Sequence, residues 1–148
     1  MTAISLNWAI NWRCKHTWKT ASYNTSWCLV GCAIGDLGTI AYFQFTGINW
    51  PVWSIMSLAI FNGLITSILL ETGILARQMA LKLAFKTAIG MSLISMIAME
   101  TAMNVTDVML TGGAVLTWWV IPLMLLAGFV TPLPYNYWRL KALGKACH

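Results

Sequence analysis

The acidic residues of this chain are the first candidates for chemistry, because all four lie within or at the end of long apolar stretches. A charged side chain inside a bilayer costs several kcal/mol, so an intramembrane carboxylate is a functional hypothesis by default. Asp36 and Glu100 are expected near the middle of two stretches, with Asn62 of a third stretch at a similar depth. No Lys or Arg lies deep within these stretches to neutralise the acids, since Lys86 stands at the very start of one of them. They must therefore share hydrogen bonds and a proton in a structural cluster, or serve a cation site or a proton relay.

Two cysteines precede Asp36 at helical spacing. Cys28, Cys32 and Asp36 are four residues apart, so in a helix they line one slowly rotating face. Thiolate donors favour Cu(I) or Zn(II) over hard cations. All four cysteines, Cys14 and Cys147 included, are predicted to lie on the reducing, cytoplasmic side, so a structural disulfide is not expected. The pair is interpreted as a soft-metal site, although small cysteines also let helices approach closely.

A second predicted helical face, which contains Glu100, carries further donors. Met96 and Met103 add thioether sulfurs, which suit Cu(I), although methionine is also a common filler of cores. Asn104 and Asp107 lie on the same face. The predicted metal ligands are therefore Cys28, Cys32, Asp36, Glu100, Met96, Met103 and Asn104, with weaker candidates near the chain ends in Cys14, His16, Cys147 and His148.

The composition decides the class of protein. Of 148 residues, 59% are hydrophobic and 9% charged, against about 45–50% and about 25% in soluble domains. These values exclude a soluble enzyme, a disordered regulator and a secreted disulfide scaffold. The sequence contains no nucleotide loop, nucleophile triad or His-rich redox site, so no catalytic activity is predicted.

Four apolar stretches are long enough to span a bilayer, which requires about 20 apolar residues, and their one basic residue is Lys86 at the start of the third. They run over about 26–45, 52–70, 85–110 and 114–132. Short uncharged connections separate the first from the second and the third from the fourth, which favours antiparallel hairpins. The predicted fold class is all-α, a polytopic membrane protein built as a bundle of four transmembrane helices.

The basic residues predict the orientation of this bundle. The nine Lys and Arg residues form three groups of three: one precedes the first stretch, one follows the second and ends with Lys86 at the start of the third, and one follows the fourth. The positive-inside rule then places both termini in the cytoplasm. It also explains the excess of basic residues without a nucleic-acid partner. Tryptophans near the start predict an interfacial segment over 1–25, followed by a transmembrane domain over 26–134 and a basic cytoplasmic tail over 135–148.

Glycines and prolines predict how the helices pack and end. Gly31, Gly35 and Gly38 form a small-residue face that permits close packing against another helix, in this chain or in a neighbour. Pro132 and Pro134 are expected to end the fourth helix, because proline disfavours its continuation.

Three segments give the chain a family resemblance: Trp27-Cys-Leu-Val-Gly-Cys-Ala-Ile-Gly-Asp36, Ala98-Met-Glu-Thr-Ala-Met-Asn104 and Pro132-Leu-Pro-Tyr-Asn-Tyr-Trp-Arg139. Over roughly 19–148 the chain resembles an uncharacterised family of small four-helix bacterial membrane proteins, a domain of unknown function. The resemblance implies a location in the bacterial inner membrane. The chain departs from the family pattern at Trp27, where relatives have His; if that His binds metal in relatives, His16 or His148 replaces it here or the ligand is lost. The matching positions are Cys28, Gly31, Cys32, Gly35, Asp36, Glu100, Asn104, Pro134, Asn136 and Trp138.

The leading functional hypothesis is the binding or handling of a soft metal, copper or zinc, with no catalysis. Cys28 and Cys32 would take the ion on the cytoplasmic side, and the acids and methionines would form a polar path or second site. The alternative is a non-catalytic accessory subunit of a larger membrane complex, such as a copper membrane monooxygenase or a respiratory oxidase. A proton or cation channel is a third hypothesis, which needs oligomerisation because four short spans enclose little volume. The expected partners are the lipid bilayer and other transmembrane subunits or further copies of this chain.

Overall fold

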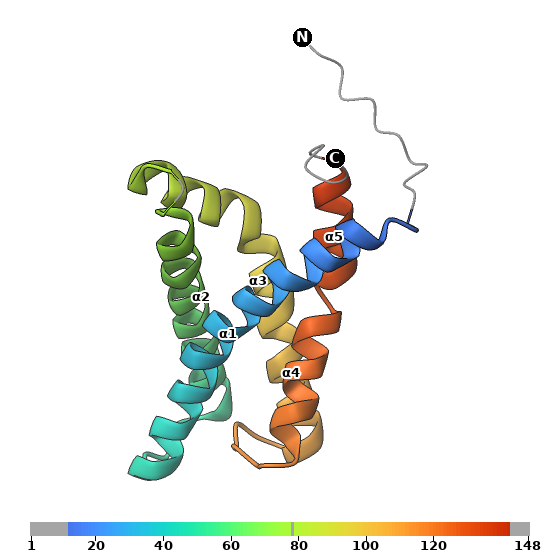
Figure 1. Cartoon of the computed structure of the whole chain (residues 1–148). Coiled ribbons are helices and arrows are strands. Elements are labelled where there is room, and N and C mark those ends of the chain that lie inside the picture. The colour runs from blue at the N-terminus through green and yellow to red at the C-terminus, as the bar shows by residue number, and fades with distance from the viewer. Residues whose placement is uncertain (1–11, 78, 143–148) are drawn as a thin grey trace.

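The computed structural model describes residues 12–77 and 79–142, and their regular structure is entirely helical (Figure 1). The all-α prediction is therefore confirmed for this part of the chain. The helices are α1 (Lys15–Thr46), α2 (Val52–Leu75), α3 (Leu81–Thr111), α4 (Val120–Val130) and α5 (Leu133–Ala142).

Four helical segments are long and apolar enough to cross a membrane, which indicates a multi-pass membrane protein. The first and third predicted stretches lie inside longer helices, because α1 begins 11 residues before the predicted stretch and α3 begins four residues before it. From Lys15 on, the predicted interfacial segment is thus the beginning of α1. The four segments are Lys15–Thr46, Val52–Leu75, Leu93–Thr111 and Val120–Ala142.

The helices run up and down, so that their connections alternate between two ends of the bundle (Figure 1). The start of α1, the connection from α2 to α3 and the end of α5 lie at one end, near the top in Figure 1. We call this the basic end, because these segments carry Arg13, Lys15, Lys19, Arg77, Lys82, Lys86, Arg139 and Lys141. The connections from α1 to α2 and from α3 to α4 lie at the opposite end, which we call the loop end.

Two glycines end helices at the loop end. Gly47 and Gly112 adopt positive φ values of 67° and 77°. Their N–H groups donate to the carbonyl oxygens of Phe43 and Val108, four residues earlier. This is the left-handed cap that closes many helices, and glycine adopts it without a steric penalty.

Close contact between α1 and α2 depends on the predicted small-residue face. A Cβ atom on Gly31 would lie 2.6 Å from Ser67 Cα, and one on Gly35 would overlap the Asn62 carbonyl group. The Thr66 hydroxyl group donates to the Gly31 carbonyl oxygen at 2.6 Å across this contact. Gly31 and Gly35 therefore pack within this chain, whereas Gly38 has open space around it.

The start of the fourth helix was predicted wrongly. The sequence predicts a span from residue 114, but α4 begins at Val120. In the segment just before α4, backbone N–H groups donate hydrogen bonds to side chains of other helices. Val115 donates to Asp107 Oδ2 at 3.2 Å, and Leu116 donates to Gln44 Oε1 at 2.9 Å. These bonds satisfy backbone groups that a helix would have paired internally.

The chain continues as a helix after the predicted stop at Pro132. α4 ends at Val130, and α5 begins at Leu133 with Pro134 in its first turn, where a missing N–H removes no intrahelical bond. Tyr137 of α5 is completely buried. Its ring centroid lies 5.0 Å from that of Trp12 and 4.4 Å from that of Trp18, at the start of α1. Much of the predicted tail is thus a helix packed on the bundle.

Candidate functional site

One buried cluster gathers sulfur-containing side chains from three helices. Cys28 and Cys32 of α1 are free thiols, with 5% and 0% of their surfaces exposed. The same cluster contains Met96, Met99 and Met103 of α3, Met124 of α4, and Val120. The predicted donor faces of the first and third spans therefore face each other, and we call these six cysteines and methionines the sulfur cluster.

Glu100 lies beside the sulfur cluster and is completely buried. Its carboxyl group contacts α2 at Gly63, where even a methyl group would overlap it. The Cys32 thiol is near enough to act as a weak donor to it, and the Asp36 carboxyl group is its electrostatic neighbour. Within the described part of the chain, neither Glu100 carboxylate oxygen accepts a hydrogen bond from an N–H or O–H group. A buried carboxylate is costly without a partner, so this group requires a proton or a cation.

Asp36 is buried next to Glu100 but has a side-chain partner. Asn104 Nδ2 donates to Asp36 Oδ1 at 3.0 Å, and it also lies 3.0 Å from the Glu100 carbonyl oxygen. Asn62, predicted to join the two acids, instead donates to Thr39 Oγ1 at 2.8 Å. The predicted polar layer is therefore an Asp36–Asn104 pair beside Glu100, without Asn62.

Asp107 has a structural role at the loop end. Its Oδ1 accepts from the Thr111 hydroxyl group at 3.2 Å, and its Oδ2 accepts from Val115 N–H at 3.2 Å. Both oxygens thus hold the connection between α3 and α4.

The sequence reasoning missed the α2 residues that face the thiols. Ser67 Oγ lies 3.4 Å from Cys28 Sγ and donates to the Cys28 carbonyl oxygen at 3.2 Å. Gly63, Ser67 and Glu71 are four residues apart, which is the same helical spacing that identified the cysteines. This repeat of small and polar residues could have identified, from the sequence, the face of the second span that packs against the cysteines.

The two weaker ligand candidates within the described residues, His16 and Cys14, do not join the cluster. His16 is exposed in the first turn of α1. Cys14 is disulfide-bonded, which contradicts the expectation that no structural disulfide forms. Cys147 and His148 lie outside the described residues.

The donor types limit which metal these residues could hold. Among residues 12–77 and 79–142, no three His, Cys, Asp or Glu side chains come together as a metal site. A zinc site of the usual kind needs three or four such ligands. Thiols combined with thioethers suit Cu(I), which prefers soft donors. The sulfur cluster therefore fits Cu(I) better than zinc.

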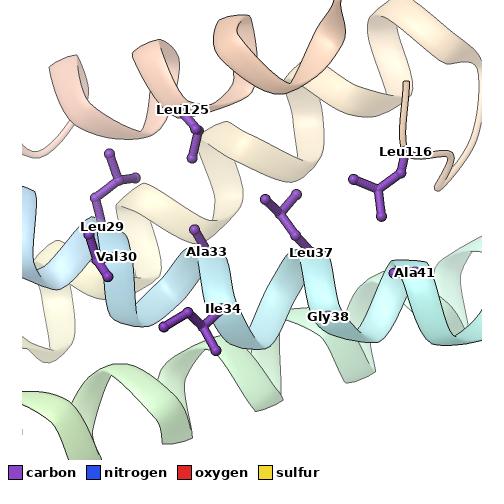
Figure 2. A pocket seen from close by; sticks show the side chains of 9 residues that line it. All are labelled: Leu29, Val30, Ala33, Ile34, Leu37, Gly38, Ala41, Leu116 and Leu125. Carbon is purple, nitrogen blue, oxygen red and sulfur yellow. The ribbon is translucent and has the colours of Figure 1, made fainter. Parts of the chain in front are cut away.

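A separate apolar groove lies between α1, α4 and the segment before α4 (Figure 2). Its volume is about 540 Å³, and it contains none of the predicted ligand residues. In a bilayer such a surface suits lipid tails or another helix. Its lining residues are Leu29, Val30, Ala33, Ile34, Leu37, Gly38, Ala41, Leu116 and Leu125.

Comparison of the chain with curated proteins and with solved structures gave no match. A protein family matches residues 17–145, which include the thiol pair, Glu100, Asn104 and α5. The match covers most of the chain, so the protein belongs to the family described as domain of unknown function DUF4396.

Proposed function

We propose that this protein binds Cu(I) within the membrane, at the sulfur cluster. The observation that carries the proposal is the burial of two free thiols and four methionines in one cluster, next to a carboxyl group that accepts from no N–H or O–H group within the described residues. Methionines alone are common core fillers. The combination with two thiols and an unsatisfied carboxyl group is unusual for a purely structural core, because buried polar groups are normally paired.

Charge balance also favours a monovalent soft ion. One thiolate neutralises one Cu(I) ion, and methionine thioethers can complete the coordination without adding charge. A neutral site is compatible with the apolar surroundings, where an unbalanced charge would be costly. Cys28 and Cys32 are the proposed principal ligands, one as the thiolate and the other as the neutral thiol, with Met96 or Met103 as thioether donors.

The proposed location is the bacterial inner membrane, with the basic end in the cytoplasm. The support is the alternation of basic and uncharged connections along the chain, which is the pattern that the positive-inside rule describes. In this orientation the thiol pair lies in the cytoplasmic half of its span.

Competition with a chromophoric Cu(I) chelator tests the proposal on the purified, detergent-solubilised protein under anaerobic conditions. The wild type should remove one Cu(I) from the chelator, whereas the Cys28→Ser/Cys32→Ser double variant should not. Glu100→Gln should weaken binding by about 10–100-fold if the carboxyl group acts as an outer partner of the ligands. Binding by the wild type that is no tighter than binding by the double variant would refute the proposal.

Two methionines of α3 provide a matched comparison for the same measurement. Met103 is completely buried in the sulfur cluster, whereas Met109 is 79% exposed. Met103→Leu should weaken Cu(I) binding, and Met109→Leu should leave it unchanged. Equal effects of the two substitutions would remove the thioethers from the proposed ligand set.

A second proposal, an accessory subunit of a larger membrane complex, is favoured by Gly38. This glycine lies inside α1, has open space around it and lines the apolar groove. Helix-interior glycines in membranes commonly mark close helix contacts, and the described chain supplies none here. The test is to purify the protein from its native membrane after mild solubilisation. Recovery of the wild type in a fixed ratio with other subunits, and loss of those subunits in Gly38→Leu, would support this role. Recovery of the wild type as a free protein would oppose it.

A further inference from the structure

A small polar cavity lies between the thiol pair and the basic end of the bundle. It is enclosed by α1, α2, α3 and α5 and has a volume of about 40 Å³. Its lining includes Asn24, Cys28, Glu71, Ser95, Asn136 and Arg139. Cys28 thus belongs both to the sulfur cluster and to the wall of this cavity.

The cavity wall contains polar atoms that the described residues do not satisfy. Ser95 is 2% exposed, and its Oγ has no hydrogen-bond partner within the described part of the chain. The buried Nε and Nη1 atoms of Arg139 likewise have none there. Burying a hydroxyl group and two guanidinium donors without partners is costly, so this geometry calls for a bound polar ligand.

Water is the ligand that fits the size and the lining. A buried water molecule needs about 10–15 Å³ of accessible volume and two to four polar partners. The cavity provides the volume for more than one, and it offers both donors and acceptors. Glu71 and Arg139 also interact with each other electrostatically across this region, so a neutral ligand suits it better than an ion of either sign.

We infer that this cavity is a hydrated port through which water from the basic end reaches the Cys28 thiol. Cys32 and the methionines of the sulfur cluster lie beyond Cys28 and do not line this cavity. Water in the cavity therefore contacts the Cys28 thiol and not the Cys32 thiol. The use of the port for metal loading rests on the proposed function, whereas the presence of water at Cys28 needs no metal.

Hydrogen–deuterium exchange of the thiols tests the inference without a metal. The S–H stretching bands of the full-length protein in lipid vesicles are followed by infrared spectroscopy after transfer to D₂O. Cys28→Ser and Cys32→Ser identify the two bands by their loss. We expect the Cys28 band to exchange promptly and the Cys32 band to exchange more slowly.

Filling the cavity should close the port. Ser95→Leu should slow exchange at Cys28 by about tenfold or more, because the thiol then exchanges only when the bundle opens locally. Ser57→Leu, on the exposed face of α2, is the matched control and should leave the rate unchanged. Asn24→Leu fills the cavity from an exposed position on α1, so it serves if Ser95→Leu does not fold.

Each outcome of this experiment decides the inference. Slow exchange at Cys28 in the wild type, or exchange that neither cavity-filling variant slows, would overturn it. Prompt exchange at Cys28 in a protein that fails to bind Cu(I) would uphold the port and refute the proposed function. Cu(I) binding by a protein with slow exchange at Cys28 would support the proposed function and refute the port.

Discussion

Asp36 and Glu100 are both completely buried, yet among the described residues only Asp36 accepts a hydrogen bond from a side-chain amide or hydroxyl group. The sequence predicts their depth, because the position of a residue along a helix follows from counting. It does not predict their partners, because these depend on how each helix is rotated about its axis. α2 turns Gly63 toward Glu100 and Asn62 toward Thr39, and this rotation is why the prediction for Asn62 failed.

The Asp36–Asn104 pair should behave as one energetic unit. Asn104→Leu leaves Asp36 without its donor and should destabilise the protein by about 1–3 kcal/mol. Asp36→Leu similarly removes the side-chain acceptor of the Asn104 amide group. The double variant removes both polar groups, so its effect should be smaller than the sum of the single effects.

Equilibrium unfolding of the three variants in mixed micelles measures this coupling. An interaction free energy of about 0.5–3 kcal/mol is expected for residues in direct contact. Strictly additive effects would show that the 3.0 Å contact between the amide and the carboxyl group contributes nothing to stability.

Between helices, the spacing of small residues determines which surfaces meet. Gly31 and Gly35 were predicted to pack against a helix, and α2 is that helix. The start of α4 could not be predicted by the same kind of reasoning, because residues 114–119 are mostly hydrophobic, as are those that follow. The tertiary contacts to Asp107 and Gln44 satisfy backbone N–H groups of this segment outside a helix.

Two glycines of α1 should differ in their tolerance of a methyl group. Gly35→Ala forces α1 and α2 apart at the Asn62 carbonyl group and should destabilise the protein by about 1–3 kcal/mol. Gly38→Ala has open space and should leave stability unchanged or raise it by up to about 1 kcal/mol, because alanine has the higher helix propensity.

Thermal unfolding of both variants in the same detergent measures the difference. A loss of stability in Gly38→Ala equal to that in Gly35→Ala would mean that the contact surface of α1 extends beyond the one described.

For the whole molecule, the up-and-down arrangement brings the basic groups of the described chain to one end (Figure 1). The proposed orientation predicts opposite labelling at the two ends. A thiol introduced by Trp118→Cys, at a position that is 91% exposed near the loop end, should react with a membrane-impermeant maleimide in intact spheroplasts. A thiol introduced by Arg77→Cys at the basic end should react only in inverted vesicles.

The wild type provides the background of native cysteines for this measurement. Labelling of Arg77→Cys, but not of Trp118→Cys, in intact spheroplasts would reverse the orientation. Equal labelling of both sites from one side would contradict an up-and-down bundle.

The sequence alone determined the class of protein, the four apolar spans and the candidate donor residues. These follow from composition and from one-dimensional spacing, because hydrophobic length and helical periodicity are properties of a local segment. Only the tertiary structure decided that the thiols and methionines share one core, that Glu100 lies against Gly63, and that α5 helps to enclose a polar cavity at Cys28. These features depend on helix rotation and on contacts between residues far apart in the chain, and local spacing contains no information about either.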